Sequence, residues 1–305
     1  MLLSGGSGFL SGDREFLSGA AGFLAGVFAF PSESSVRRVA GGIFRLAHTG
    51  ARTVGKTCAR AGNSVWSAPM KPFSLPANYP RVRRVESFAA LVGTPFGAGV
   101  NALVWERELV GDFQEVVDRL GPGAGIVTLA PAALRQLPVS AAGRRAIDVM
   151  LADWELLRAQ DLAPALNCIH AYPREAAPGP VPTDVLSFHA DSAPVEADTW
   201  LCTYHGPPSE GLRNEEARRR VDMPATRAEL LRGYGGPDDA GFADYLQEHC
   251  YDLHYAAEPG AQPFSFGHGN LWRIATEWPG SPVPPCIHRA PEQFPGQPPR
   301  LLLIS

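Results

Sequence analysis

The chain has 305 residues, of which 45% are hydrophobic and 19% are charged, as is typical of a folded protein with a sizeable core. The formal net charge of −4 argues against a nucleic-acid-binding surface spread over the whole chain, so no nucleic-acid partner is expected. The five cysteines are scattered, odd in number and form no CxxC pair. A disulfide scaffold and a structural zinc knuckle are therefore not expected, and a reducing, cytoplasmic location is predicted.

Residues 1–75 differ in composition from the rest of the chain. Within 1–69, seven basic residues stand against three acidic ones, and Gly, Ser and Ala are abundant. The apolar run over 16–30 is too short to cross a bilayer, so no membrane span is predicted. We predict that this segment is a disordered N-terminal extension or is misassigned, with Met70 as the alternative start. An amphipathic, Arg-rich targeting segment is the other interpretation.

From residue 80 onward the sequence predicts helices first and then many short strands. Asp112 is a good N-cap for a helix over 113–120, and a short strand is predicted at 125–129. A longer helix begins at Ser140 and runs to about residue 160, because apolar residues recur there at three- and four-residue spacings. The segments that follow are predicted strands at 165–172, 184–190, 199–205, 263–266, 270–276, 286–288 and 300–304, interrupted by helices over 227–232 and 239–252.

This order of elements predicts an α+β fold for residues 80–305. Proline is frequent, with 29 residues in the chain, and prolines and glycines separate the predicted strands. The core is expected to be a β-sandwich or barrel, flanked by the N-terminal helices and carrying a helical insertion.

The strongest local signal for chemistry is the segment Phe188-His189-Ala190-Asp191 at the end of a predicted strand. Side chains two positions apart on a strand project to the same face, so His189 and Asp191 can reach one metal ion together. A second imidazole is expected on another strand of the same sheet, and His288 is the best candidate. Two imidazoles and one carboxylate leave three positions open on an octahedral iron. The alternative is that these histidines are structural residues of a polar pocket.

Arg300 opens the last apolar strand, twelve positions after His288. A guanidinium buried beside a metal needs an anionic partner, and its planar fork matches a carboxylate with two parallel hydrogen bonds. Arg289 is less suitable, because the neighbour of His288 on a strand points to the opposite face.

This ordered set of residues resembles the iron(II)- and 2-oxoglutarate-dependent dioxygenase superfamily, whose fold is a double-stranded β-helix, or jelly roll. The resemblance covers about 165–305, apart from the helical insertion, and implies iron(II) and 2-oxoglutarate as cofactors. By motif position, it implies that His189, Asp191 and His288 hold the metal and that Arg300 binds the distal carboxylate of 2-oxoglutarate. It also implies Tyr204 as a second contact to that carboxylate, and oxidative decarboxylation coupled to hydroxylation of a small-molecule or protein substrate.

Several segments also resemble a bacterial family, the domain of unknown function 1826, over about 85–305. The segments are Gly99-Val100-Asn101-Ala102-Leu103, Ser187-Phe188-His189-Ala190-Asp191, Thr203-Tyr204-His205-Gly206-Pro207 and His288-Arg289-Ala290-Pro291. The family has no established reaction. Some members are thought to sit near zinc-responsive genes, which implies an association with metal homeostasis.

That association motivates a rival hypothesis, a non-catalytic zinc-binding protein on the same fold. Cys286 lies two positions before His288, so it is expected to face the same side and could complete a tetrahedral zinc set with the metal triad. Glu210 and Asn214 are candidate substrate contacts in a loop after a strand. His254, near the end of the helical insertion, is expected to be structural.

Overall fold

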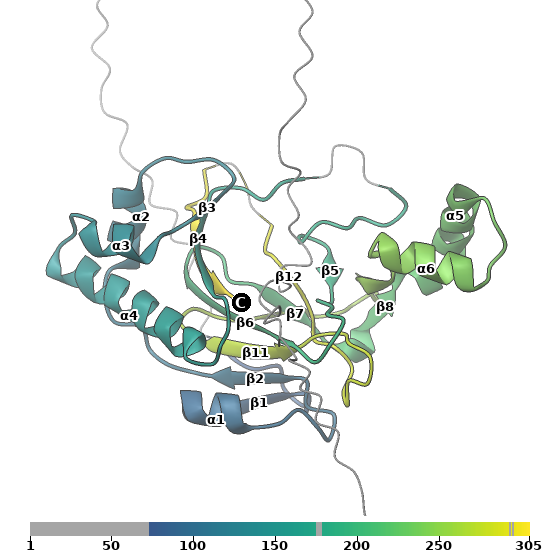
Figure 1. The fold of residues 1–305 in the computed structure, drawn as a ribbon, viewed down its shortest axis with the longest axis horizontal. Helices are drawn as coiled ribbons and strands as arrows, with labels where there is room; N and C mark the ends of the chain where they lie inside the picture. The colour runs from purple at the N-terminus through teal and green to yellow at the C-terminus, as the bar shows by residue number, and fades with distance from the viewer. Residues whose placement is uncertain (1–72, 175–178, 293, 295) are drawn as a thin grey trace, which may run out of the picture. The chain divides into compact units, whose positions relative to one another are not determined.

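The computed structural model describes residues 73–174, 179–292, 294 and 296–305, so the prediction for 1–75 lies almost wholly outside the described residues. The described part is a mixed α+β fold, as the sequence predicts, and it has two sheets and six α-helices, of which α1 (Phe88–Gly93) and α3 (Pro131–Gln136) are not predicted (Figure 1). The folded part includes Phe73, whose ring packs edge-on against Trp272 at 6.1 Å between centroids. Among the described residues, no helix combines the length and the apolar character needed to cross a membrane.

The first sheet has seven strands, and only its β1–β2 pair is parallel. In spatial order the strands are β1 (Val82–Val85), β2 (Ala102–Trp105), β11 (Leu271–Ala275), β6 (Asp198–His205), β13 (Arg300–Ile304), β4 (Ala165–Ile169) and β3 (Ile126–Thr128). The apolar runs of β6 and β13 lie in the middle of this sheet, where both faces are covered, which explains why they do not alternate with polar residues.

The second sheet has six strands, all antiparallel. In spatial order they are β10 (Phe264–Ser265), β7 (Glu210–Leu212), β12 (Ile287–Arg289), β5 (Phe188–His189), β9 (His254–Ala257) and β8 (Ala217–Arg219). A buried apolar cluster joins the two sheets, because residues next to β10 and β12 share it with side chains of β6, β11 and β13.

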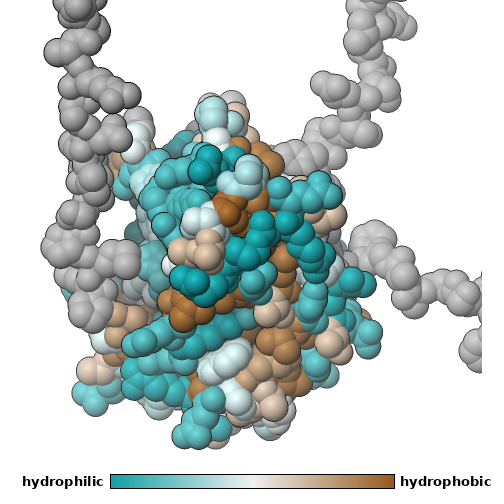
Figure 2. Space-filling view, turned by 90° about the vertical axis from the view of Figure 1, so that its left-hand side faces the viewer, coloured by the Kyte–Doolittle hydropathy of each residue, from teal (hydrophilic) through white to brown (hydrophobic). Residues whose placement is uncertain are grey.

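The helices lie in two groups at opposite sides of the sheets (Figure 1). The first group is α1 (Phe88–Gly93), α2 (Phe113–Leu120), α3 (Pro131–Gln136) and α4 (Ala141–Arg158). It packs with the seven-stranded sheet around one large apolar cluster. The second group, α5 (Pro224–Tyr234) and α6 (Ala240–Glu248), has a small core of its own. The face on the side of the first group shows mainly hydrophilic residues with hydrophobic ones between them (Figure 2).

Local chemistry accounts for the helices that the sequence predicts. The Asp112 side chain accepts a hydrogen bond from the N–H of Glu115 and so caps α2. The Ser140 hydroxyl caps α4 in the same way. The predicted helix over 239–252 is shorter in the structure, because α6 ends at Glu248 and Cys250 takes a left-handed φ of 56°. The chain then enters β9, a strand that the sequence analysis does not predict.

Candidate metal centre

The structure brings His189, Asp191 and His288 together. The Asp184 side chain accepts hydrogen bonds from the backbone N–H groups of Leu186 and Ser187, and this turn leads the chain into β5. His189 on β5 is the direct register partner of His288 on β12. Directly opposed residues of an antiparallel pair place their side chains on the same face of the sheet. The two imidazole rings accordingly lie 4.6 Å apart between centroids.

Asp191 completes the cluster from the segment just after β5. Its Oδ1 lies 3.7 Å from Nε2 of His189, and its Oδ2 lies 3.6 Å from Nε2 of His288. One ligand atom from each residue lies within 4.8 Å of the others. Ligand atoms about 2.1 Å from a shared ion stand about 3 Å apart when they are at right angles. The two carboxylate–imidazole separations therefore approach the spacing that a shared metal ion requires.

Hydrogen bonds set the tautomer of both imidazoles. Nδ1 of His189 lies 2.8 Å from the carbonyl oxygen of Ser187, and Nδ1 of His288 lies 3.3 Å from the carbonyl oxygen of Cys286. Because a carbonyl only accepts, each Nδ1 carries the proton, and each Nε2 presents a lone pair towards Asp191. Backbone carbonyls hold metal-binding histidines in this way in many proteins.

The charge states of the cluster also suit a cation. Burial disfavours the protonated ring of His189, and the charge of His288 adds to this effect, so its pKa falls to about 4. Burial alone would raise the pKa of Asp191. The two imidazoles and the Thr199 hydroxyl outweigh burial and hold that pKa below its ordinary value. At neutral pH the cluster therefore offers a neutral imidazole at position 189 and an ionised carboxylate, the states that bind metal.

Arg300, at the start of β13, is fully buried. One terminal nitrogen donates to the Tyr172 hydroxyl, and the other lies 3.2 Å from Oγ1 of Thr203 and 3.0 Å from Oγ of Ser209. Its Nε is buried and has no hydrogen-bond partner. No acidic residue of the described segments forms an ion pair with it. The Arg300 guanidinium is therefore buried without an anionic partner, and its binding of a carboxylate stays a prediction.

Tyr204 lies elsewhere, which corrects its predicted place beside Arg300. Its hydroxyl donates to Asp153 on α4 at 2.7 Å, and its ring stacks on Phe113 of α2. Alternation along β6 explains the difference, since Thr203 points to Arg300 and its neighbour therefore points to the helices. Tyr172 supplies the aromatic hydroxyl at Arg300 instead. No sequence pattern singles out Tyr172, because it lies beyond β4 and outside any motif.

Cys286 does not join the cluster, although it lies two positions before His288. Among the described residues, the group that could hold an ion consists of the two imidazoles and Asp191. The backbone carbonyl of Cys286, and not its sulfur, contacts His288, by accepting a hydrogen bond from Nδ1. Burial, with the charge of Asp191, raises the pKa of its thiol to about 12, so the sulfur stays protonated at neutral pH. The four-ligand zinc set therefore has no support in this geometry.

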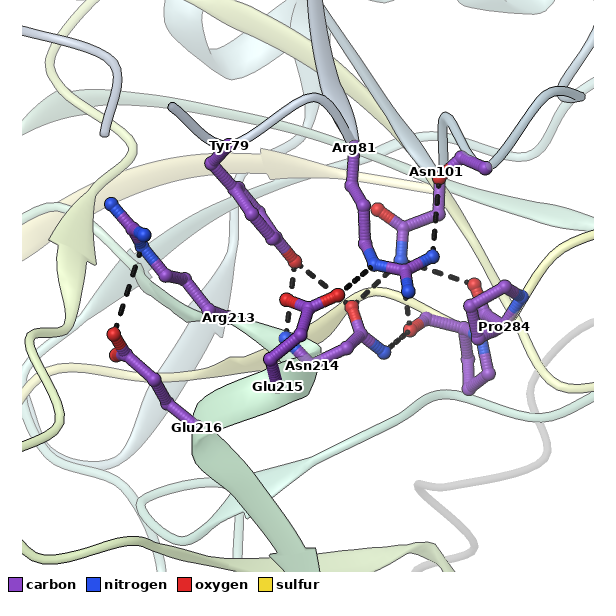
Figure 3. Close-up of polar contacts among 10 residues, drawn as sticks. Tyr79, Arg81, Asn101, Arg213, Asn214, Glu215, Glu216 and Pro284 are labelled. Carbon is purple, nitrogen blue, oxygen red and sulfur yellow. Dashed lines mark hydrogen bonds and ion pairs between the residues drawn. The ribbon is translucent and has the colours of Figure 1, made fainter. Parts of the chain in front are cut away.

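The two predicted substrate contacts have structural partners. The Glu210 carboxylate pairs with Arg289 at 2.7 Å. Asn214 belongs to a polar network in which its side chain accepts from the Tyr79 hydroxyl at 2.9 Å and from Nδ2 of Asn101 at 3.0 Å (Figure 3). Its own Nδ2 donates to the carbonyl of Pro285. This network ties the segment before β1 to the turn after β7.

His254 is a buried neighbour of the triad that the sequence analysis treats as merely structural. It is the register partner of His189, and the two ring centroids are 5.7 Å apart. The Ser187 hydroxyl donates its hydrogen to the carbonyl of Pro182, so at 2.7 Å it accepts from Nδ1–H of His254. No sequence spacing indicates a role for His254, because its strand, β9, comes to lie next to β5 only when the sheet forms.

Comparison with protein-family models, with curated proteins and with solved structures finds no match to this chain. The resemblances to the dioxygenase superfamily and to the domain of unknown function 1826 therefore remain predictions, and any function rests on the geometry of the residues themselves.

Proposed function

We propose that this protein is a non-haem iron(II)- and 2-oxoglutarate-dependent oxygenase built on a double-stranded β-helix. The observation that carries the proposal is the combination of a His-Asp-His cluster with a fully buried guanidinium that lacks an anionic partner. Either feature alone has a simpler structural explanation. Together they match a site for a metal and for a carboxylate that binds beside it.

The strand order supports the proposed fold. Between β4 and β13 the chain changes sheets at every step apart from the segment between β7 and β10, where the helical insertion with β8 and β9 lies. The neighbours that result are β4-β13-β6-β11 in one sheet and β5-β12-β7-β10 in the other. Two facing four-stranded sheets whose strands alternate along the chain in this manner are what a jelly roll requires.

Arg300 and the triad belong to the same region of the structure. Ser209, which contacts the guanidinium, lies two residues before Gly211, and Gly211 is the register partner of His288. The apolar cluster between the sheets includes Phe266, whose ring lies 6.4 Å from that of His288. A carboxylic acid bound at Arg300 would therefore lie near the metal centre and beside a largely apolar wall.

The residues present would divide the work as follows. His189, Asp191 and His288 would hold iron(II), and Arg300 with the Tyr172 hydroxyl would bind the distal carboxylate of 2-oxoglutarate. When bound, iron with 2-oxoglutarate would supply an oxidation by dioxygen in which one oxygen atom enters succinate, as carbon dioxide is released, and the other hydroxylates a C–H bond of the substrate. The carbonyls of Ser187 and Cys286 keep both Nε2 lone pairs aimed at one point. The apolar cluster that includes Phe266 would limit the access of water to the reacting groups.

Anaerobic binding of 2-oxoglutarate to iron-loaded protein tests the proposal. We expect wild type to bind it, by calorimetry and by a change in the metal absorption spectrum, and to release succinate when oxygen is admitted. Arg300→Gln should weaken that binding about 30-fold or more, because it removes one partner of a buried ion pair. Arg289→Gln is the matched control, because Arg289 points away towards Glu210 and Phe188, and it should bind normally.

Two results would overturn the proposal. One is iron-loaded wild type that neither binds 2-oxoglutarate nor changes its spectrum, and the other is an Arg300→Gln variant that binds it as tightly as wild type. Protein that retains zinc at the triad and ignores 2-oxoglutarate would instead favour the non-catalytic metal-binding alternative.

A further inference from the structure

The triad is part of a row of side chains that crosses the six-stranded sheet. Successive register pairs are Phe264 with Gly211, Gly211 with His288, His288 with His189, and His189 with His254. Directly opposed residues share a face of the sheet, so the imidazoles of His288, His189 and His254 lie side by side on neighbouring strands. At Gly211 the space that a Cβ would fill is taken by the Phe264 ring. The row is therefore apolar at its β10 end and polar at its β9 end.

Arg220 stands at the polar end of this row. In the last pair of β8 with β9, Arg219 is opposite Tyr255. Arg220, next in the chain, begins the 3-10 helix η2 (Arg220–Asp222), which packs against β9. Continued by one residue, the register of β8 with β9 sets Arg220 opposite His254. The positive charge of Arg220 acts on that imidazole, since it adds to the burial and to the charge of His189 that lower the pKa of His254 to about 3.

The Arg220 guanidinium is half-buried and has no partner within the described part of the chain. Its Nε is buried without a hydrogen bond, and no ion pair involves it. Neither of two acidic groups in this region pairs with it: Asp252 lies 3.9 Å from Arg219 through Oδ2 and keeps a buried Oδ1 without a hydrogen bond, and Asp184 accepts from two backbone N–H groups. Burial accordingly lowers the pKa of Arg220, with no neighbouring acid to offset it.

We propose that Arg220 forms an oxyanion subsite for the substrate, on the His254 side of the metal centre. This inference rests on the proposed function and adds a substrate class to it: a small molecule that carries a carboxylate or phosphate group. The triad then lies between two unpaired guanidinium groups. Arg300, on the β7 side of the triad, binds the co-substrate. Arg220, on the β9 side, binds the anionic end of the substrate, so that the carbon skeleton of the substrate extends towards the metal.

Inorganic phosphate and acetate are the probes. Protein is loaded anaerobically with manganese(II), an ion that suits nitrogen and oxygen ligands, and is saturated with 2-oxoglutarate so that Arg300 is occupied. Paramagnetic relaxation of the ³¹P signal then reports phosphate held near the metal, and competition by acetate shows whether a carboxylate takes the same place. We expect saturable relaxation in wild type and an affinity about tenfold or more lower in Arg220→Gln, because one charge-assisted contact is lost.

Two further variants make the test decisive. Arg220→Lys should recover part of the affinity, since it keeps the charge. Arg232→Gln, which removes an exposed charge from α5, should behave as wild type. Equal phosphate affinity in Arg220→Gln and wild type would overturn the proposal, as would a loss of the same size in Arg232→Gln.

The failure of the proposed function is recognised separately. If manganese or 2-oxoglutarate does not bind, the oxygenase proposal fails. Calorimetric titration of phosphate into the metal-free protein still tests the Arg220 subsite. Saturable phosphate binding that is lost in Arg220→Gln supports the subsite, and phosphate binding that is unchanged in Arg220→Gln contradicts it.

Discussion

Thr199 shows how a single hydroxyl orders the metal centre. It lies on β6, in the seven-stranded sheet, and its Oγ1 donates to Oδ2 of Asp191 at 2.5 Å. The other sheet carries both histidines, so this hydrogen bond connects the two sheets at the site. A carboxylate held in this way keeps one orientation, and the hydroxyl also favours its ionised form.

We therefore expect Thr199→Val to weaken metal binding about 10- to 100-fold while the fold persists, because an outer contact of a metal ligand is lost. Equilibrium dialysis against zinc or manganese measures the affinity. Thr276→Val is the matched control, since Thr276 is also a buried threonine and its hydroxyl donates to the carbonyl of Ala197. If Thr199→Val binds metal as tightly as wild type and as Thr276→Val, Thr199 has no role in orienting Asp191.

The alternation of side chains along a strand shows which predictions about single residues a sequence pattern can support. The two-residue period of a strand predicts that His189 and Asp191 share a face, and the structure brings them to within 3.7 Å. The same period shows that Tyr204 cannot accompany Thr203 to Arg300. Which of the two residues points inward depends on the register of β6 against β13, and a sequence read alone does not specify that register.

At the scale of elements, α4 is tied to the seven-stranded sheet by buried polar contacts as well as by apolar packing. Asp153 on α4 receives both terminal nitrogens of Arg107, which follows β2, and the hydroxyl of Tyr204. The Asp153 side chain is 2% exposed, so these partners replace the hydrogen bonds that water would give its carboxylate oxygens. This explains how Tyr204 serves the fold.

Asp153→Ala should lower the free energy of unfolding by about 3–5 kcal/mol, because it leaves the Arg107 guanidinium buried without its partner. Urea unfolding followed by circular dichroism measures this change. Asp148→Ala, on the exposed side of the same helix, should change the unfolding free energy by less than about 0.5 kcal/mol. Similar losses in both variants would show that helix propensity, and not the buried pair, is responsible.

The helical insertion shows what periodicity misses. Apolar spacing predicts a helix over 239–252, and α6 with its own small core agrees with most of that range. The strands β8 and β9 on either side of the two helices are three and four residues long and carry no strict alternation. β9 pairs with β5, and β8 pairs with β9, so these contacts stabilise both strands in the folded chain and place His254 beside the triad.

At the scale of the whole molecule, buried thiols make the stability depend on pH. Burial raises the pKa of Cys202 to about 12 and that of Cys168 to about 11. In the unfolded chain these thiols ionise near pH 8.5. Above that pH the unfolded state loses protons that the folded state retains, so the stability contributed by each thiol is present below about pH 8.5 and is lost as pH rises towards the folded pKa.

We expect the unfolding free energy, measured in urea with a reductant present, to fall between pH 9 and pH 10.5 by about 1.4 kcal/mol per pH unit for each such thiol. Cys202→Ala should make that slope shallower by about 1.4 kcal/mol per pH unit, the contribution of one thiol, whatever the substitution does to the unfolding free energy at pH 7. A slope that is unchanged in Cys202→Ala would contradict the assignment.

Sequence patterns were enough to predict the α+β class of the fold, the capped helices α2 and α4, most core strands, and the candidates His189, Asp191, His288 and Arg300. These features follow from local rules, namely the period of a strand or helix, capping side chains and the chemistry of single residues. The pairing of His189 with His288 and the replacement of Tyr204 by Tyr172 at Arg300 became visible in the folded chain alone. The same holds for the exclusion of Cys286 from the cluster and for the place of His254 beside His189. Those outcomes depend on pairings between strands far apart in the chain, and such pairings are selected by the packing of both sheets together.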